Sequence, residues 1–298
     1  MMDILIFGGS GFVGQHLAKY LEKMGYQVWV ASRRQQEVRY GKNVVYTLGQ
    51  ILPLLENREQ EYGVINLAGQ SINSGSWTAA RKKEILESRI HVTQGITEAI
   101  MQVNRKPQVL INASAIGFYG YSDEKTFTEE DAKGTGFLAE VTQQWEETAK
   151  RAKSHTRVVL ARLGVVLGRD GGALPRMATP YSFYLGGRVG TGKQWMSWVH
   201  IDDVCGIFHH CIGRDTIEGP VNVTAPVPER MDRFGKAIGD VLHKPHWIPV
   251  PSFALQLLLG EMSEIVLQGQ RVLPEKMLGS GYSFQYGTVS SALQDLLK

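Results

Sequence analysis

The sequence contains almost no cysteine, no long apolar run and little excess of either charge. Its two cysteines, Cys205 and Cys211, are too few for a disulfide framework and match no common zinc or redox spacing, so we interpret both as buried thiols. No apolar stretch approaches the roughly 20 residues that span a bilayer, so we expect no membrane association. Lysine and arginine total 32 against 29 acidic residues, and no basic stripe accompanies the net charge of +3, so nucleic acid is not an expected partner.

The first residues carry no basic segment and run directly into an apolar stretch at residues 4–7, which indicates no removable signal. Together with the scarcity of cysteine, this predicts a reducing, cytoplasmic location. The remaining composition is that of an ordinary globular protein, with 43% hydrophobic and 20% charged residues among 298. That length suffices for one large domain or two modest ones.

Short apolar runs alternate with helical patterns through about residue 168. Apolar side chains recur at helical spacing from Val13 to Met24, between two runs that suit buried strands. We predict strands at residues 4–7, 28–31, 44–46, 64–68, 109–113, 157–166 and 221–224, and helices at residues 13–24, 77–101, 137–152, 253–259 and 292–297. This alternation predicts an α/β fold with a Rossmann-type doubly wound parallel sheet and right-handed crossovers.

The character of the sequence changes after residue 168. Residues 186–192 form a glycine-rich loop, and the end of the chain combines two short helices with a turn-rich middle. No internal repeat or low-complexity linker separates these parts. We therefore predict a main domain of residues 1–226, with an inserted substrate loop at about 169–198, and a small, mainly helical C-terminal lobe of residues 227–298.

A glycine-rich turn follows the first predicted strand and opens the first predicted helix. In that context bare backbone lets a pyrophosphate approach the amides of the helix N-terminus, which carry partial positive charge. The alternative is a turn that only packs the helix against the strand. The predicted dinucleotide-binding residues are Gly8, Gly9, Ser10, Gly11, Phe12, Val13 and Gly14.

The end of the second predicted strand favours NADP(H) over NAD(H). An acidic residue at this position would accept hydrogen bonds from the adenosine ribose and repel a 2′-phosphate, but the chain has Ser32, Arg33 and Arg34 there. An arginine fork can bind a phosphate bidentately and stack on adenine. The alternative is a pair of solvated arginines at a strand end, paired with Glu37.

Further motifs carry a family resemblance. They are Asn66-Leu67-Ala68-Gly69, Trp77 with Arg81-Lys82-Lys83-Glu84 and Ser88-Arg89, Ala113-Ser114-Ala115-Ile116-Gly117-Phe118-Tyr119-Gly120, Gly164-Val165-Val166-Leu167-Gly168, Gly190-x-Gly192-x-Gln194-Trp195-x-Ser197-Trp198-x-His200-Ile201-x-Asp203, and Gly269-Gln270-x-Val272-Leu273-Pro274. With them the chain resembles the extended short-chain dehydrogenase/reductases, the sugar-nucleotide epimerase and dehydratase group. Within that group it is similar to an atypical branch called epimerase family proteins.

The resemblance implies an NADP-binding Rossmann domain with substrate loops from the C-terminal half. The cofactor contacts that it implies, beyond the glycine-rich turn, are Ser32, Arg33, Leu67, Ala68, Glu84, Arg89 and Val165. Small residues at the end of a strand, as in Leu67-Ala68-Gly69, would let a ribose lie against the backbone. Taken alone, Glu84 and Arg89 would indicate an exposed helical face.

The acid/base pair of short-chain reductases is the difficult part of this resemblance. Such enzymes use a tyrosine and a lysine four residues later, with a nearby serine that holds the substrate. Ser114 occupies the serine position, unless its hydroxyl only caps the strand-end turn. Phe137 and Val141 stand where the tyrosine and lysine are expected, and neither can move a proton.

Two other tyrosines are relevant. Tyr121 and Lys125 have the tyrosine–lysine spacing, but they lie in a glycine- and acid-rich stretch without helical periodicity, so they need not share a face. Tyr119 directly follows the strand and either supplies the proton, with a pKa tuned by the charge of the cofactor, or packs as an aromatic residue at the site wall. In the first case Ser114 and Tyr119 would both face the nicotinamide.

The sequence thus supports NADP(H) binding more strongly than turnover. One hypothesis is an NADP(H)-dependent oxidoreductase or epimerase-type enzyme for a small carbonyl or hydroxyl compound or a nucleotide-linked sugar. Gln194, Trp198 and His200 would then line the substrate side, although a large tryptophan or a satisfied histidine can equally fill a domain junction. The second hypothesis is a catalytically silent NADPH-binding sensor or interaction module. By analogy with such folds, a homodimer through the helices that flank the sheet is also expected.

Overall fold

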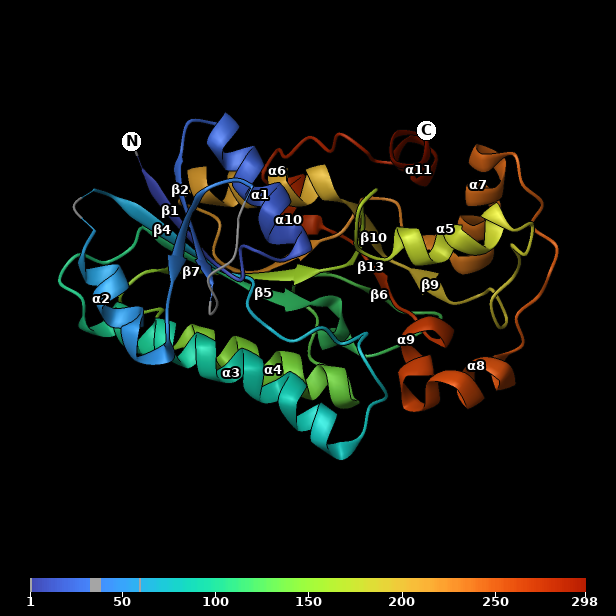
Figure 1. Ribbon diagram of the computed structural model, residues 1–298, viewed down its shortest axis with the longest axis horizontal. Helices are drawn as coiled ribbons and strands as arrows, with labels where there is room; N and C mark the ends of the chain where they lie inside the picture. Colours follow the sequence, from blue (N-terminus) through green and yellow to red (C-terminus); the bar gives the residue numbers. More distant parts are fainter. Residues whose placement is uncertain (1, 33–38, 59) are drawn as a thin grey trace.

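A twisted parallel sheet forms the centre of the molecule (Figure 1). The computed structural model describes residues 2–32, 39–58 and 60–298. Within these residues, the sheet has seven strands in the spatial order β3 (Lys42–Val45), β2 (Gln27–Ser32), β1 (Asp3–Phe7), β4 (Tyr62–Asn66), β5 (Val109–Ala115), β7 (Arg157–Leu163) and β11 (Gly219–Val223). Neighbouring strands in it are parallel, which confirms the predicted doubly wound α/β fold.

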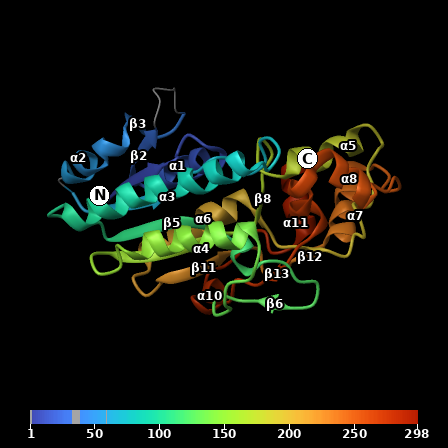
Figure 2. The same cartoon turned by 90° about the horizontal axis from the view of Figure 1, so that it is seen from below.

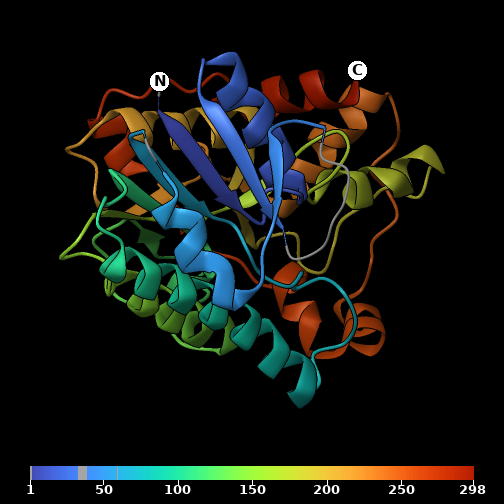
Figure 3. The ribbon, with the colours of Figure 1, turned by 60° about the vertical axis from the view of Figure 1, so that its left-hand side comes forward.

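Helices cover both faces of the sheet, because strands such as β1 are buried on both faces and each face needs an apolar cover. One face packs against α1 (Phe12–Lys23) and α6 (Ile201–Gly213). The other packs against α2 (Ile51–Glu56), α3 (Ala79–Gln102) and α4 (Phe137–Lys150), and α3 and α4 lie side by side (Figure 2). Figure 3 shows the sheet between the two layers, with α1 in blue above and α3 in teal below.

Two predictions from the sequence concern residues in helices: the burial of the two cysteines, and the expectation that no segment spans a membrane. Cys205 and Cys211 are both buried free thiols on α6, as expected. No helix in the described part of the chain combines the length and apolar character that crossing a bilayer requires.

Two short 3-10 helices lie near the ends of β3 and β5, at Leu48–Gln50 and Ile116–Tyr119.

The predicted strand at residues 157–166 is wrong at its end, because the chain changes partners at Gly164. β7 stops at Leu163, and β8 (Val165–Leu167) pairs instead with β10 (Trp198–His200) outside the main sheet. The amide of Gly164 donates to Val223 of β11, whereas the amide of Val165 donates to Ser197. A Cβ on Gly164 would lie 2.5 Å from the Ser197 carbonyl oxygen, so the crossing needs a glycine.

A second, smaller lobe lies beside the sheet, at the right of Figure 1. Its helices are α5 (Leu174–Ser182), α7 (Met231–Leu242) and α11 (Val289–Leu297), and β9 (Trp195–Met196) pairs there with β12 (Glu229–Arg230). Trp198 and Phe234 are fully buried in the core of this lobe. The lobe therefore draws on residues from both sides of position 226.

The C-terminal segment returns to the main sheet. It contains α8 (Ser252–Leu259), the 3-10 helix η3 (Gly260–Ser263), α9 (Glu264–Leu267), β13 (Arg271–Val272) and α10 (Glu275–Gly279). β13 pairs in parallel with β6 (Thr126–Phe127), and α10 packs against β11. A domain boundary at residue 226 stays a prediction.

Candidate functional site

A pocket of about 630 Å³ opens at the carboxyl ends of the central strands. The chain order reverses between β1 and β4, and this switch point is where doubly wound sheets bind ligands. The pocket is lined by Gly8, Ser10, Gly11, Ala31, Ser32, Tyr46, Leu67, Ala68, Gly69 and Gln70. Segments after β1, β2 and β4 that were predicted from separate motifs therefore meet in one place.

The positions Gly8, Gly11 and Gly14 each suit a glycine for a different structural reason. Gly8 adopts a φ of +76°, and a Cβ there would lie 2.8 Å from the amide nitrogen of Ala68, so the turn can approach β4 only without a side chain. A Cβ on Gly14 would lie 2.5 Å from the Cα of Gly9, so α1 could not pack against the turn. Gly11 would meet only the Gly8 carbonyl, at 3.4 Å, and it leaves bare backbone facing the pocket.

The N-terminus of α1 suits an anion. Gly11 is the N-cap residue and provides no side-chain cap, and the first turn of α1 contains no acidic side chain. The amides at the start of a helix carry partial positive charge and need acceptors, which a diphosphate can supply. The geometry of the turn therefore fits a dinucleotide.

Two residues of the turn face away from the pocket. Phe12 packs against the loop that follows β8: a Cβ on Gly168 or Gly171 would lie 2.3 Å from an atom of its ring. Val13 packs against the apolar cluster under α1. Both support the turn, and neither lines the pocket.

The end of β2 brings Ser32 to the pocket. Its hydroxyl is buried and donates to Asn43 Oδ1 at 3.3 Å. Arg33 and Arg34, together with Glu37, lie outside the described residues, so their predicted contact with a 2′-phosphate stays a prediction. Tyr46 is a lining residue that the sequence analysis missed, because only the pairing of β3 with β2 brings it there.

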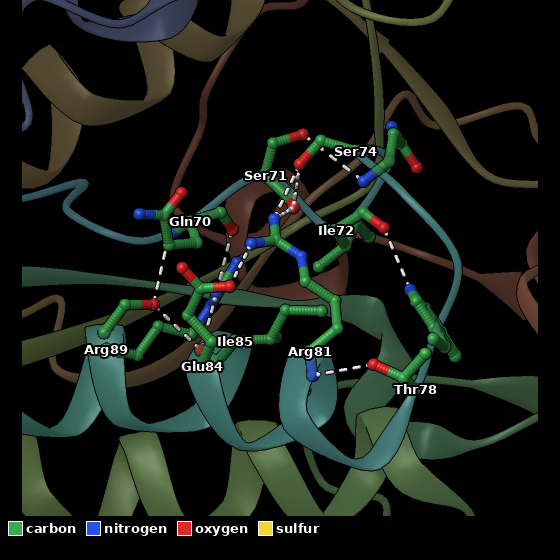
Figure 4. Close-up of polar contacts among 12 residues, drawn as sticks. Gln70, Ser71, Ile72, Ser74, Thr78, Arg81, Glu84, Ile85 and Arg89 are labelled. Carbon is green, nitrogen blue, oxygen red and sulfur yellow. Dashed lines mark hydrogen bonds and ion pairs between the residues drawn. The ribbon is translucent and has the colours of Figure 1, made fainter.

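The loop after β4 is held by the first turns of α3 (Figure 4). Arg89 Nη1 donates to the Gln70 carbonyl at 3.1 Å, and the Gln70 amide donates to Ser88 Oγ at 3.0 Å. Arg81 Nη2 donates to the Ser71 carbonyl and to Ser74 Oγ, both at 2.6 Å. These contacts fix the wall of the pocket that Gly69 and Gln70 form.

Arg89 is half-buried against the loop after β4, so an exposed helical face does not describe it. A Cβ on Gly69 would lie 3.1 Å from its side chain. Burial, assisted by the positive charge of Arg81, lowers the pKa of Arg89 to about 10. Glu84 is more exposed and pairs with Arg81. Neither Glu84 nor Arg89 lines the pocket, and their contact with a cofactor stays a prediction.

Ser114 and Tyr119 belong to a buried polar network. Ser114 donates to Glu146 Oε1 at 2.7 Å, and Arg162 binds the same carboxylate through two nitrogens at 2.8 and 2.9 Å. The Tyr119 hydroxyl donates to Asn222 Oδ1 at 2.7 Å and accepts from Arg162 at 2.8 Å. Burial raises the pKa of Tyr119 to about 12. Both hydroxyls have internal partners, and their predicted catalytic roles stay a prediction.

Phe137 and Val141 lie in an apolar cluster at the start of α4. The cluster also contains Trp77 and, from the C-terminal segment, Met262 and Ile265. Lys82 lies over the Phe137 ring at 5.3 Å and pairs with Glu261. The positions expected to hold an acid/base pair therefore anchor the C-terminal segment to α3 and α4.

Tyr121 and Lys125 have separate surroundings. Burial, with a contribution from the charge of Glu264, raises the pKa of Tyr121 to about 12. Lys125 Nζ pairs with Asp131 at 2.7 Å. This fits the expectation that the tyrosine–lysine spacing is accidental.

The predicted substrate-side residues are buried and have internal partners. Gln194 donates to the carbonyls of Val189 and Val266, at 3.1 and 3.0 Å. Trp198 is fully buried and donates to the Val227 carbonyl at 3.1 Å. His200 caps α6 by accepting from the Asp202 amide at 3.1 Å. These bonds support the glycine-rich loop and the second lobe, and the predicted contact of the three residues with a substrate stays a prediction.

Val165, the last predicted cofactor residue, begins β8 and is partly buried against the second lobe. It does not line the pocket. Its place directly after the partner change at Gly164 puts it at the junction between the main sheet and the second lobe.

Comparison with known proteins gives a consistent match over the whole chain. Residues 4–223 match the NAD dependent epimerase/dehydratase family, and residues 250–296 match a domain of unknown function, DUF1731. Epimerase family protein YfhF of Bacillus subtilis is 44% identical, over 99% of this chain and 98% of its own. The chloroplastic SDR39U1 homolog of Arabidopsis thaliana is 36% identical, over 100% of this chain and 87% of its own. The crystal structure of human epimerase family protein SDR39U1 (isoform 2) with NADPH superposes with a TM-score of 0.92 at 29% identity, covering 99% of both chains.

Proposed function

The chain belongs to the NAD dependent epimerase/dehydratase family, and from that premise we propose that it binds NADP(H) and acts as an oxidoreductase or epimerase-type enzyme. Its substrate is a small carbonyl or hydroxyl compound, a class that includes nucleotide-linked sugars. A homodimer and a cytoplasmic location are parts of the same proposal.

The pocket at the switch point is the observation that carries this proposal. Gly8, Gly11 and Ser32 line it together with Leu67 and Ala68, so a diphosphate would meet the uncapped start of α1 while the adenosine lies toward the end of β2. No acidic side chain lines the described pocket, which favours a cofactor with an additional phosphate. The human relative that binds NADPH supports the same choice, because it shares the fold over nearly the whole chain.

When bound, NADP(H) supplies a hydride donor or acceptor. The residues of this chain would bind and orient it: the amides of the glycine-rich turn would hold the diphosphate, and Arg33 with Arg34 would hold the 2′-phosphate. Arg89 fixes the Gly69–Gln70 wall of the pocket by its bond to Gln70. Ser114 and Tyr119 act here as positioning residues that hold the ends of the strands. Their hydroxyls form hydrogen bonds with Glu146, Arg162 and Asn222.

A catalytically silent NADPH-binding module is the second candidate function. It is favoured by the contacts of Phe137 and Val141, which serve to anchor the C-terminal segment. In that case cofactor binding would be read out by a partner rather than by turnover.

Cofactor binding is tested by calorimetric titration of NADPH and of NADH. The wild type should bind NADPH more tightly, and Arg33→Glu should weaken NADPH binding by about tenfold or more while changing NADH binding little. Arg176→Glu, an exposed change of the same type on α5, serves as the control and should change neither affinity. Equal loss of both cofactors in Arg33→Glu would refute the NADP(H) preference, and no uptake of either cofactor would refute the proposal as a whole.

Turnover is tested separately by mixing NADPH-loaded protein with a panel of carbonyl compounds, including nucleotide-linked ketosugars, and following the absorbance of the reduced nicotinamide. Oxidation in a single turnover supports the enzyme. Tight NADPH binding with no oxidation by any compound supports the silent module.

A further inference from the structure

A second cleft, of about 500 Å³, lies at the start of α7. It shares no lining residue with the pocket at the switch point. Four cationic side chains line it: Arg188, Lys193, Arg230 and Arg233. Because they come from the glycine-rich loop and from the β12–α7 junction, the fold brings together charges that are about 40 residues apart in the sequence.

The acidic side chains of the cleft are largely occupied. Asp232 pairs with Lys236 at 2.8 Å and with His246 at 3.1 Å, and neither of these two residues lines the cleft. Asp123 Oδ1 lies 3.9 Å from Arg230 Nη1. Glu124 is the remaining acid of the lining.

Two of the cations remain without a partner. Among the described residues, the side chains of Arg188 and Lys193 form no hydrogen bond or ion pair. Within the part of the chain that the structure describes, Arg233 pairs only with Glu229, at 4.0 Å. Four cationic side chains and three acidic side chains line the cleft, and two of the acids already pair with cations. The cleft therefore has an excess of positive charge, which favours an anionic ligand.

The cleft is built from fixed parts. The Arg230 guanidinium stacks on Trp195 at 3.8 Å and donates to the carbonyls of Lys193 and Asp123. Gly192 has a φ of +71°, and a Cβ there would lie 2.8 Å from the Cβ of Asp232, so this loop can lie against α7 only with a glycine.

The first amides of α7 are already used by this loop. Met231 donates to the Gln194 carbonyl and Asp232 to the Gly192 carbonyl, each at 3.0 Å. A ligand of the cleft would therefore be recognised by side chains. Guanidinium and ammonium groups bind phosphate strongly, and arginine does so bidentately.

We propose that this cleft binds a phosphate-bearing small molecule. A phosphate group presents several oxygens at once, so it can accept from the guanidinium of Arg188 bidentately and from the ammonium of Lys193 at the same time. The volume of the cleft is within the range of small-molecule sites. The phosphate belongs either to the substrate or to a separate phosphorylated effector, and the inference does not depend on the proposed NADP(H) site.

The experiment is a calorimetric titration of inorganic pyrophosphate into the full chain, with and without saturating NADP⁺. We expect binding to persist with NADP⁺ present, and Arg188→Glu combined with Lys193→Glu to weaken it by about tenfold or more. Arg176→Glu combined with Lys150→Glu changes the net charge equally at exposed positions outside the cleft, and it should retain binding. NADPH affinity, measured on the same samples, should be equal in both double variants.

Three results would overturn the proposal: no binding of pyrophosphate, competition by NADP⁺, or equal loss in both double variants. A failure of NADPH uptake would instead refute the proposed function and leave the comparison of the two double variants valid. If turnover occurs and the cleft binds the substrate, the half-saturating concentration of phosphorylated substrates should be higher for the variant with Arg188→Glu and Lys193→Glu than for the wild type. The half-saturating concentration of substrates without a phosphate should be the same for both proteins. Pyrophosphate binding without that difference identifies the phosphate as that of an effector.

Discussion

Phe137 meets Trp77 edge-on, with ring centroids 5.1 Å apart and ring planes at 69°. Phe137 begins α4, whereas Trp77 precedes α3, and both belong to the apolar cluster that also includes Met262 and Ile265 of the C-terminal segment. The Trp77 indole also donates to the Ile72 carbonyl at 2.9 Å, within the loop that continues from the cofactor pocket. The contact thus links the wall of the pocket to the DUF1731 region.

Replacing Phe137 with alanine should loosen the C-terminal segment. The side chain is partly buried, so we expect a loss of about 2–3 kcal/mol in the free energy of unfolding, below the value for a full core position. Hydrogen exchange should increase in residues 260–267. Phe253→Ala is the matched control, since that side chain is 72% exposed, and it should change stability by less than about 0.5 kcal/mol. Unchanged exchange in residues 260–267 would show that Phe137 does not anchor them.

The buried carboxylate of Glu146 should contribute strongly to the stability of the fold. Glu146→Gln removes the charge that pairs with Arg162 and accepts from Ser114, and leaves a buried guanidinium uncompensated. We expect a loss of about 3–5 kcal/mol in urea unfolding. Glu147→Gln changes the next, exposed residue of α4 and should be nearly neutral. Equal stability of the two variants would remove the structural role assigned to Ser114 and its partners.

The strand–turn–helix unit at the start of the chain could be predicted closely, because its signals are local. The apolar run at residues 4–7 falls within β1, and the turn Gly8–Gly14 leads into α1 at Phe12. The end of β7 could not be predicted, since only the approach of the distant Ser197 makes the chain change partners at Gly164. Periodicity reports which residues are buried but not which strand they join.

The same limit applies to the site. Gly8, Ser32 and Ala68 lie at or just after strand ends and were each predicted to bind the cofactor, and they lie together because parallel strands end at one edge of a sheet. Trp198 and His200 belong to a motif that is equally specific. Their side chains, however, contact the second lobe and the start of α6, and the local sequence does not determine that direction. Arg188 and Lys193 lie within the predicted glycine-rich loop, but the positions of their partners on α7 were not evident.

The stability of the protein should fall as the pH decreases below about 6.5. Burial lowers the pKa of His200 from its ordinary value of 6.5, and its ring also lies against Asp295 and caps α6. Below pH 6.5 the unfolded chain therefore binds more protons than the folded chain. The free energy of unfolding consequently becomes smaller as the pH is lowered. Burial lowers the pKa of His209 and His210 in the same direction.

His200→Asn isolates the contribution of His200 to this pH dependence. Asparagine keeps a side-chain acceptor at the N-cap of α6 but does not titrate. Urea unfolding between pH 7.5 and pH 5, which spans the ordinary value of 6.5, should give a flatter dependence than in the wild type. His91→Asn, at an exposed position on α3, should follow the wild-type curve. A curve for His200→Asn as steep as that of the wild type would contradict the assignment.

Gly14→Ala should weaken NADPH binding through the packing of α1. The added Cβ would lie 2.5 Å from the Cα of Gly9 and 2.6 Å from its carbonyl oxygen, and backbone atoms cannot move aside as a flexible side chain can. The turn and the start of α1 must separate, which takes the helix amides away from the diphosphate, so we expect NADPH affinity to fall by about tenfold or more. Gly213→Ala is the matched control, because its Cβ would meet no atom within 4 Å, and calorimetry should show unchanged NADPH affinity. Tight NADPH binding by a folded Gly14→Ala variant would mean that the cofactor does not lie against the glycine-rich turn.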